Sequence, residues 1–443
     1  MKTGVSSTVI TPPIGVVLGG NGREDSRSRG VSDDLRANAV FLDNGREKFA
    51  FVGLDLLAIA QEDCDIVRDR VEKELGVPAS NFMIFATHTH SGPNVVKIFL
   101  SDEQESREVD AYRATLRDKI VQVVKAARDS AFEGKIAFVK GSEPEFSHNR
   151  RVLMQDGSVK MIFEEYDHGK IEALLGVNGL PDLNIFLVAD SGDRVRALMI
   201  NYASHPACIC GQDWLFSRDY VNYLTVELQK VYGEQLVVVY ANGPQGNLVW
   251  SDAYDPFVTG FEEAERVGKG LAESVIKTIS GSKIEYHGDP TLKTLLRRIR
   301  LPSRRITDEM IEDAKKIAAV KEDSIQLHGL DPKIGALDLL RLASAQKEAE
   351  DAVIQAVVLG ECLILTFPGE VFVEFALEIM KRSKFKYTMI FGLANSYVGY
   401  IPVERAFGEG GYEVKTSVGS RCAPQAGEVL TREVIALMNE ISK

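Results

Sequence analysis

The chain has 443 residues, a formal net charge of −12, and proportions of hydrophobic (45%) and charged (26%) residues that are ordinary for a globular protein. Its length suffices for one large domain or for two to three smaller ones. Its acidic balance argues against a nucleic-acid-binding surface and against attachment to anionic lipid through a polybasic patch.

Segments that would direct the chain into a membrane or out of the cell are not found in the sequence. The N-terminus lacks the basic and apolar regions of a signal peptide, and no run approaches about 18 apolar residues. The cysteines are five in number without a CxxC pair, which argues against a disulfide framework and against a thiolate zinc site. We therefore expect a cytoplasmic protein without a transmembrane segment, whose cysteines, including Cys208 and Cys210, are free and buried.

Strands and helices alternate along the chain after an opening that is rich in Gly, Ser and Arg. Residues 1–30 are expected to be irregular, and the region of about 303–350 is expected to be a helical surface insertion, broken at 329–332. The other predicted elements are strands at 38–43 and 49–55 joined by an Asn44-Gly45 turn, a helix at 61–75, a strand at 82–86, a helix at 108–131, strands at 136–141, 185–190, 195–204 and 235–241, a helix at 260–280, two strands within 353–367, a helix that begins at Glu370, a strand at 389–393 and a helix at 427–441.

This order of elements predicts an α/β or α+β fold, in which mixed sheets form layers flanked by helices. Several neighbouring strands are joined by tight turns, which argues against a purely parallel, doubly wound sheet. No internal repeat, low-complexity tract or Pro/Ser linker divides the sequence. We therefore predict a single domain over residues 1–443.

Two histidines stand at the end of an apolar run that is typical of a buried strand. The run over 82–86 continues into Thr87-His88-Thr89-His90-Ser91-Gly92-Pro93, where Gly and Pro predict a turn. In an extended segment, residues i and i+2 point to the same face, so His88 and His90 are expected side by side. Two imidazoles at the mouth of a sheet suit a catalytic metal site. A chance His-x-His with solvated or core histidines would give the same pattern.

Other predicted strand ends carry polar residues for which a hydrophobic core has no use. His205 follows an apolar strand, and Glu370 follows another. Two histidines and one glutamate would make a zinc site with an open position. Each residue also has a plain structural explanation, since His205 could be a satisfied core residue and Glu370 could be a helix cap. Arg150, Tyr400 and Tyr412 stand at further strand ends or in loops of the same kind.

Four motifs, in this order, resemble the neutral ceramidase family (neutral/alkaline non-lysosomal ceramidases). They are THTHSGP at 87–93, NYASHP at 201–206, FPGE at 367–370 and NSYVGY at 395–400. Shorter matches at 4–13, 35–39, Asn149-Arg150, Asp219-Tyr220 and Tyr412-Glu413 extend the resemblance over essentially the whole chain. The resemblance implies a ceramidase-like catalytic domain, and the family's C-terminal immunoglobulin-like domain is not expected here.

The resemblance also implies a set of roles for individual residues. A single Zn²⁺ would be held by His88, His205, Glu370 and Tyr400. Catalytic roles would fall to three further residues, namely His90, Arg150 and Tyr412. A zinc ion activates water and polarises a carbonyl, so His90 is expected to handle a proton or the oxyanion, while Arg150 and Tyr412 orient the carbonyl oxygen. Tyr397 competes with Tyr400 as the phenol ligand.

One departure from the family bears on the substrate. The family carries a GDVSP segment with a serine in its active site, whereas this chain has Asn247 and Val249 at the positions of the Asp and the Ser. We therefore expect a zinc-dependent hydrolase acting on the amide, ester or lactone of a soluble small molecule. A genuine ceramide amidase, a non-catalytic metal-containing binding protein, and an iron or manganese site remain alternatives. The arginines at 23, 27, 29 and 421 could bind an anionic substrate or be plain solvated surface.

Overall fold

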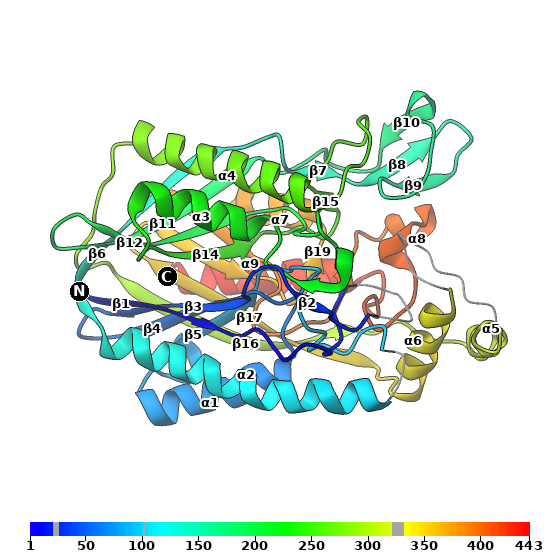
Figure 1. Cartoon of the computed structure of the whole chain (residues 1–443), viewed down its shortest axis with the longest axis horizontal. Coiled ribbons are helices and arrows are strands. Elements are labelled where there is room, and N and C mark those ends of the chain that lie inside the picture. The colour runs from blue at the N-terminus through cyan, green and yellow to red at the C-terminus, as the bar shows by residue number, and fades with distance from the viewer. Residues whose placement is uncertain (21–25, 101–102, 321–331) are drawn as a thin grey trace.

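Three groups of four strands, each covered by two helices, form the body of the protein (Figure 1). The computed structural model describes residues 1–20, 26–100, 103–320 and 332–443. Mixed sheets flanked by helices confirm the predicted fold class. Two of the strand groups are joined in one eight-stranded sheet through a short contact between β1 and β6, where Lys2 pairs with Glu133 and Thr3 with Phe132. The third group is a separate four-stranded sheet.

The three groups, here called the first, second and third units, share one strand order. In each unit the first three strands are antiparallel neighbours, a helix crosses over, the fourth strand pairs in parallel with the third, and a second helix follows. The first unit comprises β1 (Lys2–Val9), β3 (Arg36–Asp43), β4 (Lys48–Leu54), α1 (Gln61–Leu75), β5 (Phe82–Ala86) and α2 (Glu103–Asp129). The second comprises β6 (Phe132–Ser142), β11 (Asp182–Asp190), β12 (Val195–Tyr202), α3 (Tyr220–Tyr232), β14 (Val237–Asn242) and α4 (Phe261–Gly281). The third comprises β16 (Leu292–Pro302), β17 (Ala349–Leu359), β18 (Cys362–Thr366), α7 (Val373–Arg382), β20 (Tyr387–Phe391) and α9 (Ala426–Ile441).

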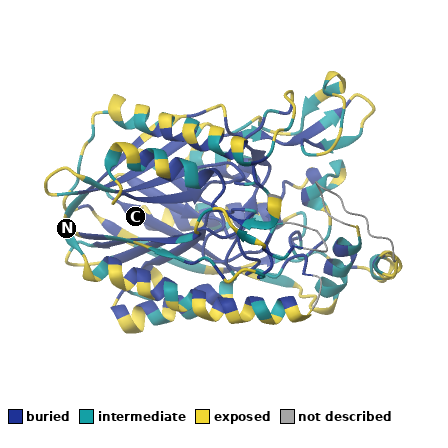
Figure 2. Cartoon of the chain, viewed as in Figure 1, coloured by how far each residue is buried: buried dark blue, intermediate teal, exposed yellow. Residues whose placement is uncertain are grey.

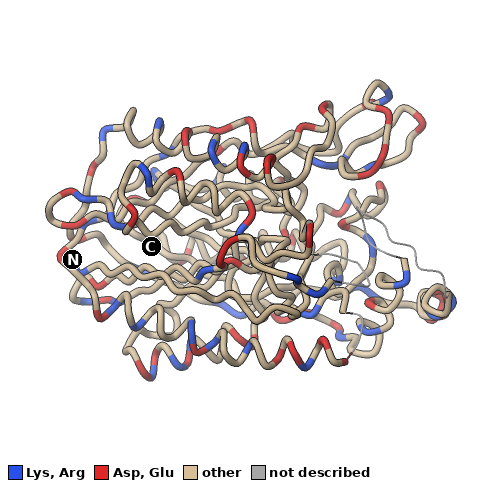
Figure 3. The backbone as a smooth tube through the Cα atoms, in the orientation of Figure 1, with Lys and Arg blue, Asp and Glu red and all other residues tan. Residues whose placement is uncertain are grey.

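A central hydrophobic core lies between the three units, and its members come from all of them. Phe51 and Phe85 of the first unit, Phe186 of the second, and Ile364 and Phe391 of the third belong to this one cluster. A separate apolar cluster lies between each unit and its own pair of helices. The strands are therefore buried on both faces, which explains their nearly continuous apolar sequences (Figure 2). The charged residues lie mainly on the covering helices and the loops (Figure 3).

The parallel pair in each unit decides where the functional loops lie. These pairs are β4 with β5, β12 with β14, and β18 with β20. Loops at the carboxyl ends of parallel strands in open α/β sheets are the usual place for a ligand site. His88, His205 and Glu370 all follow such strands, each in a different unit. The repeated arrangement is structural, because the sequence itself shows no internal repeat.

Several predicted elements are correct and four regions differ. The helix at 61–75 and the strand at 82–86 are confirmed to the residue. Residues 2–9 are the strand β1 rather than irregular chain, because they pair along their full length with the apolar strand β3. Helix α3 and strand β16 were not predicted. Glu370 does not begin a helix, since it lies in the short strand β19 (Glu370–Val371) and α7 begins at Val373.

The predicted helical insertion lies between β16 and β17. It contains α5 (Asp308–Ala318) and α6 (Pro332–Ser344), while the predicted break at 329–332 falls largely outside the described residues. A small sheet of β8 (Arg151–Met154), β9 (Val159–Met161) and β10 (Ile171–Leu174) extends from the second unit. The remaining short elements are β2 (Gly30–Val31), β7 (His148–Asn149), β13 (Leu215–Phe216), β15 (Leu248–Val249), β21 (Tyr400–Ile401) and α8 (Ala406–Glu409). Within the described parts of the chain, no helix combines the length and the apolar character needed to cross a membrane.

Candidate metal centre

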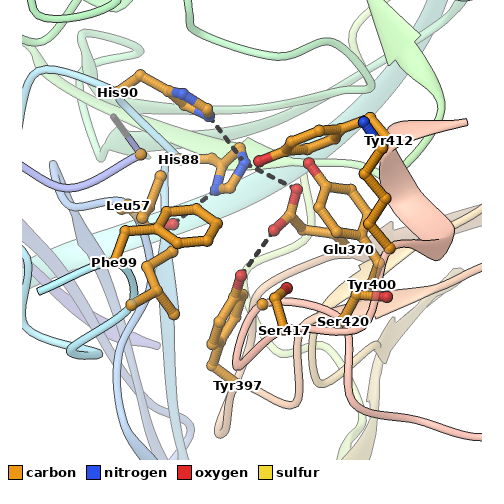
Figure 4. Close-up of a pocket in the computed structure, with 14 residues that line it drawn as sticks. Leu57, His88, His90, Phe99, Glu370, Tyr397, Tyr400, Tyr412, Ser417 and Ser420 are labelled. Atoms are coloured by element: carbon orange, nitrogen blue, oxygen red, sulfur yellow. Dashed lines mark hydrogen bonds and ion pairs between the residues drawn. The ribbon is translucent and has the colours of Figure 1, made fainter. Parts of the chain in front are cut away.

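Side chains from all three units converge at the shared carboxyl end of the parallel strands. Figure 4 shows those of the first and third units, with His88 beside Glu370. Glu370 Oε2 lies 3.1 Å from His88 Nε2 and 3.2 Å from His205 Nε2. His90 Nε2 lies 3.3 Å from His88 Nε2. His88, His205 and Glu370 are almost fully buried, with at most 2% of each residue exposed, whereas His90 is half-buried. The sequence therefore predicted correctly that these four residues meet.

The ring nitrogens of His88 and His205 are oriented by carbonyl groups of the main chain. His88 Nδ1 lies 2.7 Å from the carbonyl oxygen of Leu57, and His205 Nδ1 lies 2.8 Å from that of Leu248. A carbonyl only accepts, so each Nδ1 carries a proton, and in the neutral ring the lone pair is on Nε2. This hydrogen bond on the opposite nitrogen is the arrangement that fixes metal-binding imidazoles in their tautomer.

The contact between His205 Nε2 and Glu370 Oε2 brings two acceptors together. Burial, reinforced by the charge of Arg150, lowers the pKa of His205 to about 4, so its ring is neutral at pH 7 and holds no proton at Nε2. An unprotonated nitrogen and a carboxylate oxygen repel each other at such a distance unless a cation lies between them. A tetrahedron with metal–ligand bonds of about 2.0–2.1 Å has edges of about 3.3 Å, close to the separations seen here. The donor set thus fits a divalent metal ion.

His88 and His90 lie together for a reason that differs from the predicted one. Strand β5 ends at Ala86, and His88 has a positive φ of 76°, so the segment is not extended at this point. A positive φ is rare for a residue with a side chain and costs about 1–3 kcal/mol. The predicted proximity is confirmed, but a left-handed turn produces it rather than strand alternation. Gly20 permits the arrangement, since a Cβ there would lie 2.7 Å from His90 Nδ1.

Arg150 lies beside the centre and is held by a buried carboxylate. Its Nε donates to Glu413 Oε1 at 2.8 Å, and its Nη1 lies 3.2 Å from His205 Nε2. Burial disfavours the cation, but Tyr400 and Glu413 outweigh that effect and raise the pKa of Arg150 above its usual value. Glu413 also accepts from Arg151 Nη1 at 2.7 Å, so one carboxylate holds two buried guanidinium groups. The sequence placed Arg150 at the site, but nothing in it singled out Arg151.

The two competing tyrosines make different contacts at the site. Tyr397 Oη donates to Glu370 Oε1 at 2.7 Å. Tyr400 Oη lies 3.5 Å from His205 Nε2 and accepts from Arg150 Nη2 at 3.0 Å. Tyr400 is therefore next to the histidine nitrogen, whereas Tyr397 bonds to the far oxygen of the carboxylate. Burial raises the pKa of both phenols well above the usual value.

A small pocket opens onto the centre. It encloses about 430 Å³ when the solvent at its mouth is included, of which about 20 Å³ is open to the centres of water molecules. That inner space suits one or two waters. The lining residues are Gly20, Leu57, His88, His90, Ile98, Phe99, Glu370, Tyr397, Tyr400, Tyr412, Lys415, Ser417, Gly419 and Ser420. Tyr412 is among the lining residues, and its catalytic role stays a prediction.

Val249, which replaces the family serine, does not line this pocket. Its side chain is 3% exposed and packs in the apolar cluster of the second unit with Trp250 and Tyr202. The neighbouring Asn247 is used structurally, because its Oδ1 accepts from the Val373 N–H at 3.0 Å, at the start of α7. The departure from the family motif thus lies in packed interior rather than on the wall of the site.

The helical insertion fixes two of the loops that line the pocket. Asp338 of α6 is fully buried and accepts from the main-chain N–H of Phe99 at 3.1 Å and of Val418 at 2.6 Å. Arg341 of the same helix donates to the Leu100 carbonyl at 2.8 Å. Sequence reasoning missed Asp338, since an acidic residue in a region rich in Lys and Glu looks like ordinary solvated surface. Its one distinguishing sign is its place among Ala and Leu within α6.

We expect the replacement Asp338→Ala to loosen both loops. Two buried N–H groups would lose their acceptor, which should lower the free energy of unfolding by about 2–3 kcal/mol. Hydrogen exchange followed by mass spectrometry should show faster exchange in the peptides that contain Phe99 and Val418. Asp313→Ala, at an exposed position of α5, is the matched control and should change neither. Unchanged exchange at both loops in the Asp338 variant would contradict the conclusion that Asp338 holds them in place.

Known structures resemble this chain in fold, although no protein-family model and no curated protein matches its sequence. The neutral ceramidase from Pseudomonas aeruginosa superposes with a TM-score of 0.73 at 18% identity, over 99% of this chain and 74% of that chain. A structure described as ceramidase complexed with C2 superposes with a TM-score of 0.74, also at 18% identity and with the same coverage of 99% and 74%. The chain therefore has a neutral ceramidase-like fold, as the sequence motifs predicted.

Proposed function

We propose that this chain, which has the fold of the neutral ceramidases, is a zinc-dependent hydrolase that cleaves an amide, ester or lactone carbonyl of a small-molecule substrate. One observation carries the proposal, namely that His88 Nε2, His205 Nε2 and Glu370 Oε2 meet at one centre. The Nδ1 atoms of both histidines donate to main-chain carbonyls, so the Nε2 atoms are the ones that face the centre. A purely structural cluster would have no need to aim three acceptors at one point. An amide is favoured among the three bonds because the structural neighbours are ceramidases.

Zinc is the metal that this donor set suits best. Two imidazoles and one carboxylate, with a position left open, form a ligand set of catalytic zinc sites. Tyr400 is proposed as the further ligand, since its hydroxyl is beside His205 Nε2. Bound at this centre, zinc supplies a Lewis acid for a carbonyl oxygen and a hydrolytic nucleophile at neutral pH.

The residues around the centre have separate proposed tasks. Arg150 keeps its charge at every accessible pH and points Nη1 toward the centre, so it stabilises the oxyanion that develops on the substrate carbonyl. Tyr412 lines the pocket next to Tyr400, with ring centroids 5.8 Å apart, and orients the same oxygen. His90 is proposed to move a proton between the attacking water and the leaving group. Burial lowers its pKa well below the usual value, so its ring is neutral at pH 7 and one of its nitrogens has a free lone pair.

The pocket favours a small substrate over a long-chain lipid. Its inner space of about 20 Å³ takes little more than the reacting group, so most of any larger substrate would remain at the mouth. A true lipid amidase would need a broad apolar groove beside the metal. The apolar side chains that line this pocket are Leu57, Ile98 and Phe99 with the tyrosine rings, and the rest of the lining is polar or glycine.

Metal analysis joined to a substrate panel tests the proposal. The purified protein should contain about one metal ion per chain, and treatment with a chelator should abolish hydrolysis that added Zn²⁺ restores. The panel should contain N-acetyl amides, acetyl esters, lactones and a long-chain ceramide, with Mn²⁺ and Fe²⁺ as competing metals. Absence of both stoichiometric metal and hydrolysis would overturn the function. Preferential turnover of the ceramide would overturn the small substrate.

The two tyrosines are expected to give different results when each is changed to phenylalanine. Tyr397→Phe removes the hydrogen bond that holds Glu370 Oε1, so metal affinity should fall by about 10-fold to 100-fold. Tyr400→Phe removes a ligand and a partner of Arg150, so both metal affinity and kcat should fall. Metal titration and steady-state kinetics on the two variants would check this. If Tyr397→Phe weakened the metal more than Tyr400→Phe and lowered kcat as well, Tyr397 would be the better ligand.

A further inference from the structure

One loop supplies most of the polar groups at the outer wall of the pocket. It runs from Tyr412 to Ser420, and Tyr412, Lys415, Ser417 and Ser420 all line the cavity. Lys415 and Glu370 are the lining residues with a formally charged side chain, if the histidines are set aside. Glu370 is committed to the histidine centre. Lys415 is exposed and forms no ion pair within the described ranges, so its ammonium group is available to a ligand.

Other cations that could attract an anion are committed to the protein. Arg421 donates to Glu350 at 3.0 Å and to the Tyr397 carbonyl at 2.7 Å. Arg27 pairs with Glu108, and Arg29 stacks on the ring of Trp214. None of these arginines is among the lining residues, and Arg23 lies outside the described residues. The Arg-rich start of the chain therefore does not supply the charge at the pocket, and Lys415 does.

A hydroxyl lies in the same wall. Ser417 is 6% exposed and lines the pocket, and among the described residues its side chain has no hydrogen-bond partner in the protein. Its oxygen is open to the pocket, so a ligand bound there can form a hydrogen bond with it in place of water. Figure 4 shows Ser417 on the same side of the cavity as Ser420, near Tyr397 and opposite His90. Lys415 and Ser417 thus offer a cation and a hydroxyl, the donors that bind a carboxylate.

The loop is held in place, so these donors are pre-organised. Arg304 Nη1 donates to the Thr416 hydroxyl at 2.9 Å, and Asp338 accepts from the Val418 N–H at 2.6 Å. Ser420 Oγ donates to the Glu413 carbonyl at 2.6 Å within the loop, and the Glu413 side chain anchors the loop to Arg150. A fixed loop with an unused cation at its tip binds a ligand at little cost in conformational entropy.

We propose that the loop over 412–420 is the specificity element of the site and binds a carboxylate group of the substrate through Lys415 and Ser417. This inference rests on the proposed function, because the scissile carbonyl would lie at the His88–His205–Glu370 centre. The substrate class that fits is an N-acylated amino acid with a short acyl group. Its amide reaches the centre while its carboxylate remains at the mouth beside Lys415.

Matched substrates with and without the charge test the proposal. N-acetylglycine and its neutral analogue N-acetylglycinamide should be compared for kcat/KM in the wild type and in Lys415→Met. We expect the wild type to favour the carboxylate, and the ratio of the two kcat/KM values to fall about fivefold to tenfold in the variant. Lys415→Arg, which keeps the charge, should retain most of the preference. Lys384→Met, at an exposed position outside the pocket, is the control and should not change the ratio.

A binding measurement separates failure of this inference from failure of the proposed function. Calorimetry with the same two compounds reports the preference even in a protein that does not turn them over. A carboxylate preference that depends on Lys415 in calorimetry supports the binding role, and hydrolysis of either compound supports the function separately. Hydrolysis without any Lys415-dependent preference would overturn the binding role alone. Absence of both hydrolysis and a Lys415-dependent preference would overturn the two together.

Discussion

Replacing His205 with alanine is expected to remove the metal and to lower kcat/KM by about 1,000-fold or more. His205 offers an Nε2 lone pair that its hydrogen bond to Leu248 fixes in direction, and the alanine side chain offers no donor at all. Glu370 would then face a single oriented nitrogen, that of His88, and tetrahedral coordination would be incomplete. Loss of the proposed zinc ion would remove the Lewis acid and the source of the hydrolytic nucleophile, so the effect on rate should be among the largest of any single change.

The measurement is metal content by mass spectrometry beside steady-state hydrolysis of the best substrate in the panel. His287→Ala is the matched control, because this histidine is 39% exposed and lies at a distance in sequence from every motif of the site. The control should keep both its metal and its activity. A His205→Ala protein that is folded by circular dichroism and still holds stoichiometric metal would refute the proposed ligand set.

Replacing Glu413 with alanine is expected to lower the free energy of unfolding by about 3–5 kcal/mol. Glu413 and Arg151 have fully buried side chains, and that of Arg150 is only 5% exposed. Removing the carboxylate leaves two guanidinium groups in the interior without their counter-charge, and a buried charge without its partner is far costlier than a broken surface pair. The loss should exceed that of a typical surface substitution several-fold.

Equilibrium unfolding in urea would measure this effect, with Glu409→Ala as control. Glu409 contacts the same Arg151 at 3.2 Å but is 23% exposed, so its loss should cost about 1 kcal/mol or less. Glu413→Gln keeps the shape and should lie between the two. Because Glu413 also orients Arg150, folded Glu413→Gln protein should show a lower kcat than the wild type. Equal free energies of unfolding for Glu413→Ala and Glu409→Ala would show that the buried ion pairs of Glu413 with Arg150 and Arg151 stabilise the fold no more than a partly exposed pair does.

The repeated strand order explains why the site is assembled from such distant segments. His88 follows the fourth strand of the first unit, whereas His205 and Glu370 follow the third strands of the second and third units. These strands belong to parallel pairs, so their carboxyl ends meet at one end of the molecule. The residues of the centre need not be near one another in sequence, since each unit contributes its own loop to it.

Local sequence alone predicted which residues meet at the centre and much of the secondary structure. Apolar runs gave β5 and the other central strands, and 3.6-residue periodicity gave α1, because both patterns follow from which face is buried. The short motifs around His88, His205, Glu370 and Tyr400 gave the residues of the site and the resemblance to the ceramidase fold. The same reasoning missed β1, whose polar residues are explained only by the strands beside it.

Tertiary structure alone decided the geometry and the surroundings. The turn at His88 depends on a positive φ, which cannot be predicted from the residue type. The hydrogen bonds that orient His88 and His205 go to carbonyl groups that are distant in the sequence. Sequence comparison placed the protein's specificity at Val249, yet that side chain is packed in the interior. Instead, the loop with Lys415 lines the pocket, and the hydrogen bond from Val418 to Asp338 holds that loop in place. Burial and long-range hydrogen bonds decide which polar residues serve a site, and both are properties of the packed chain rather than of any local pattern.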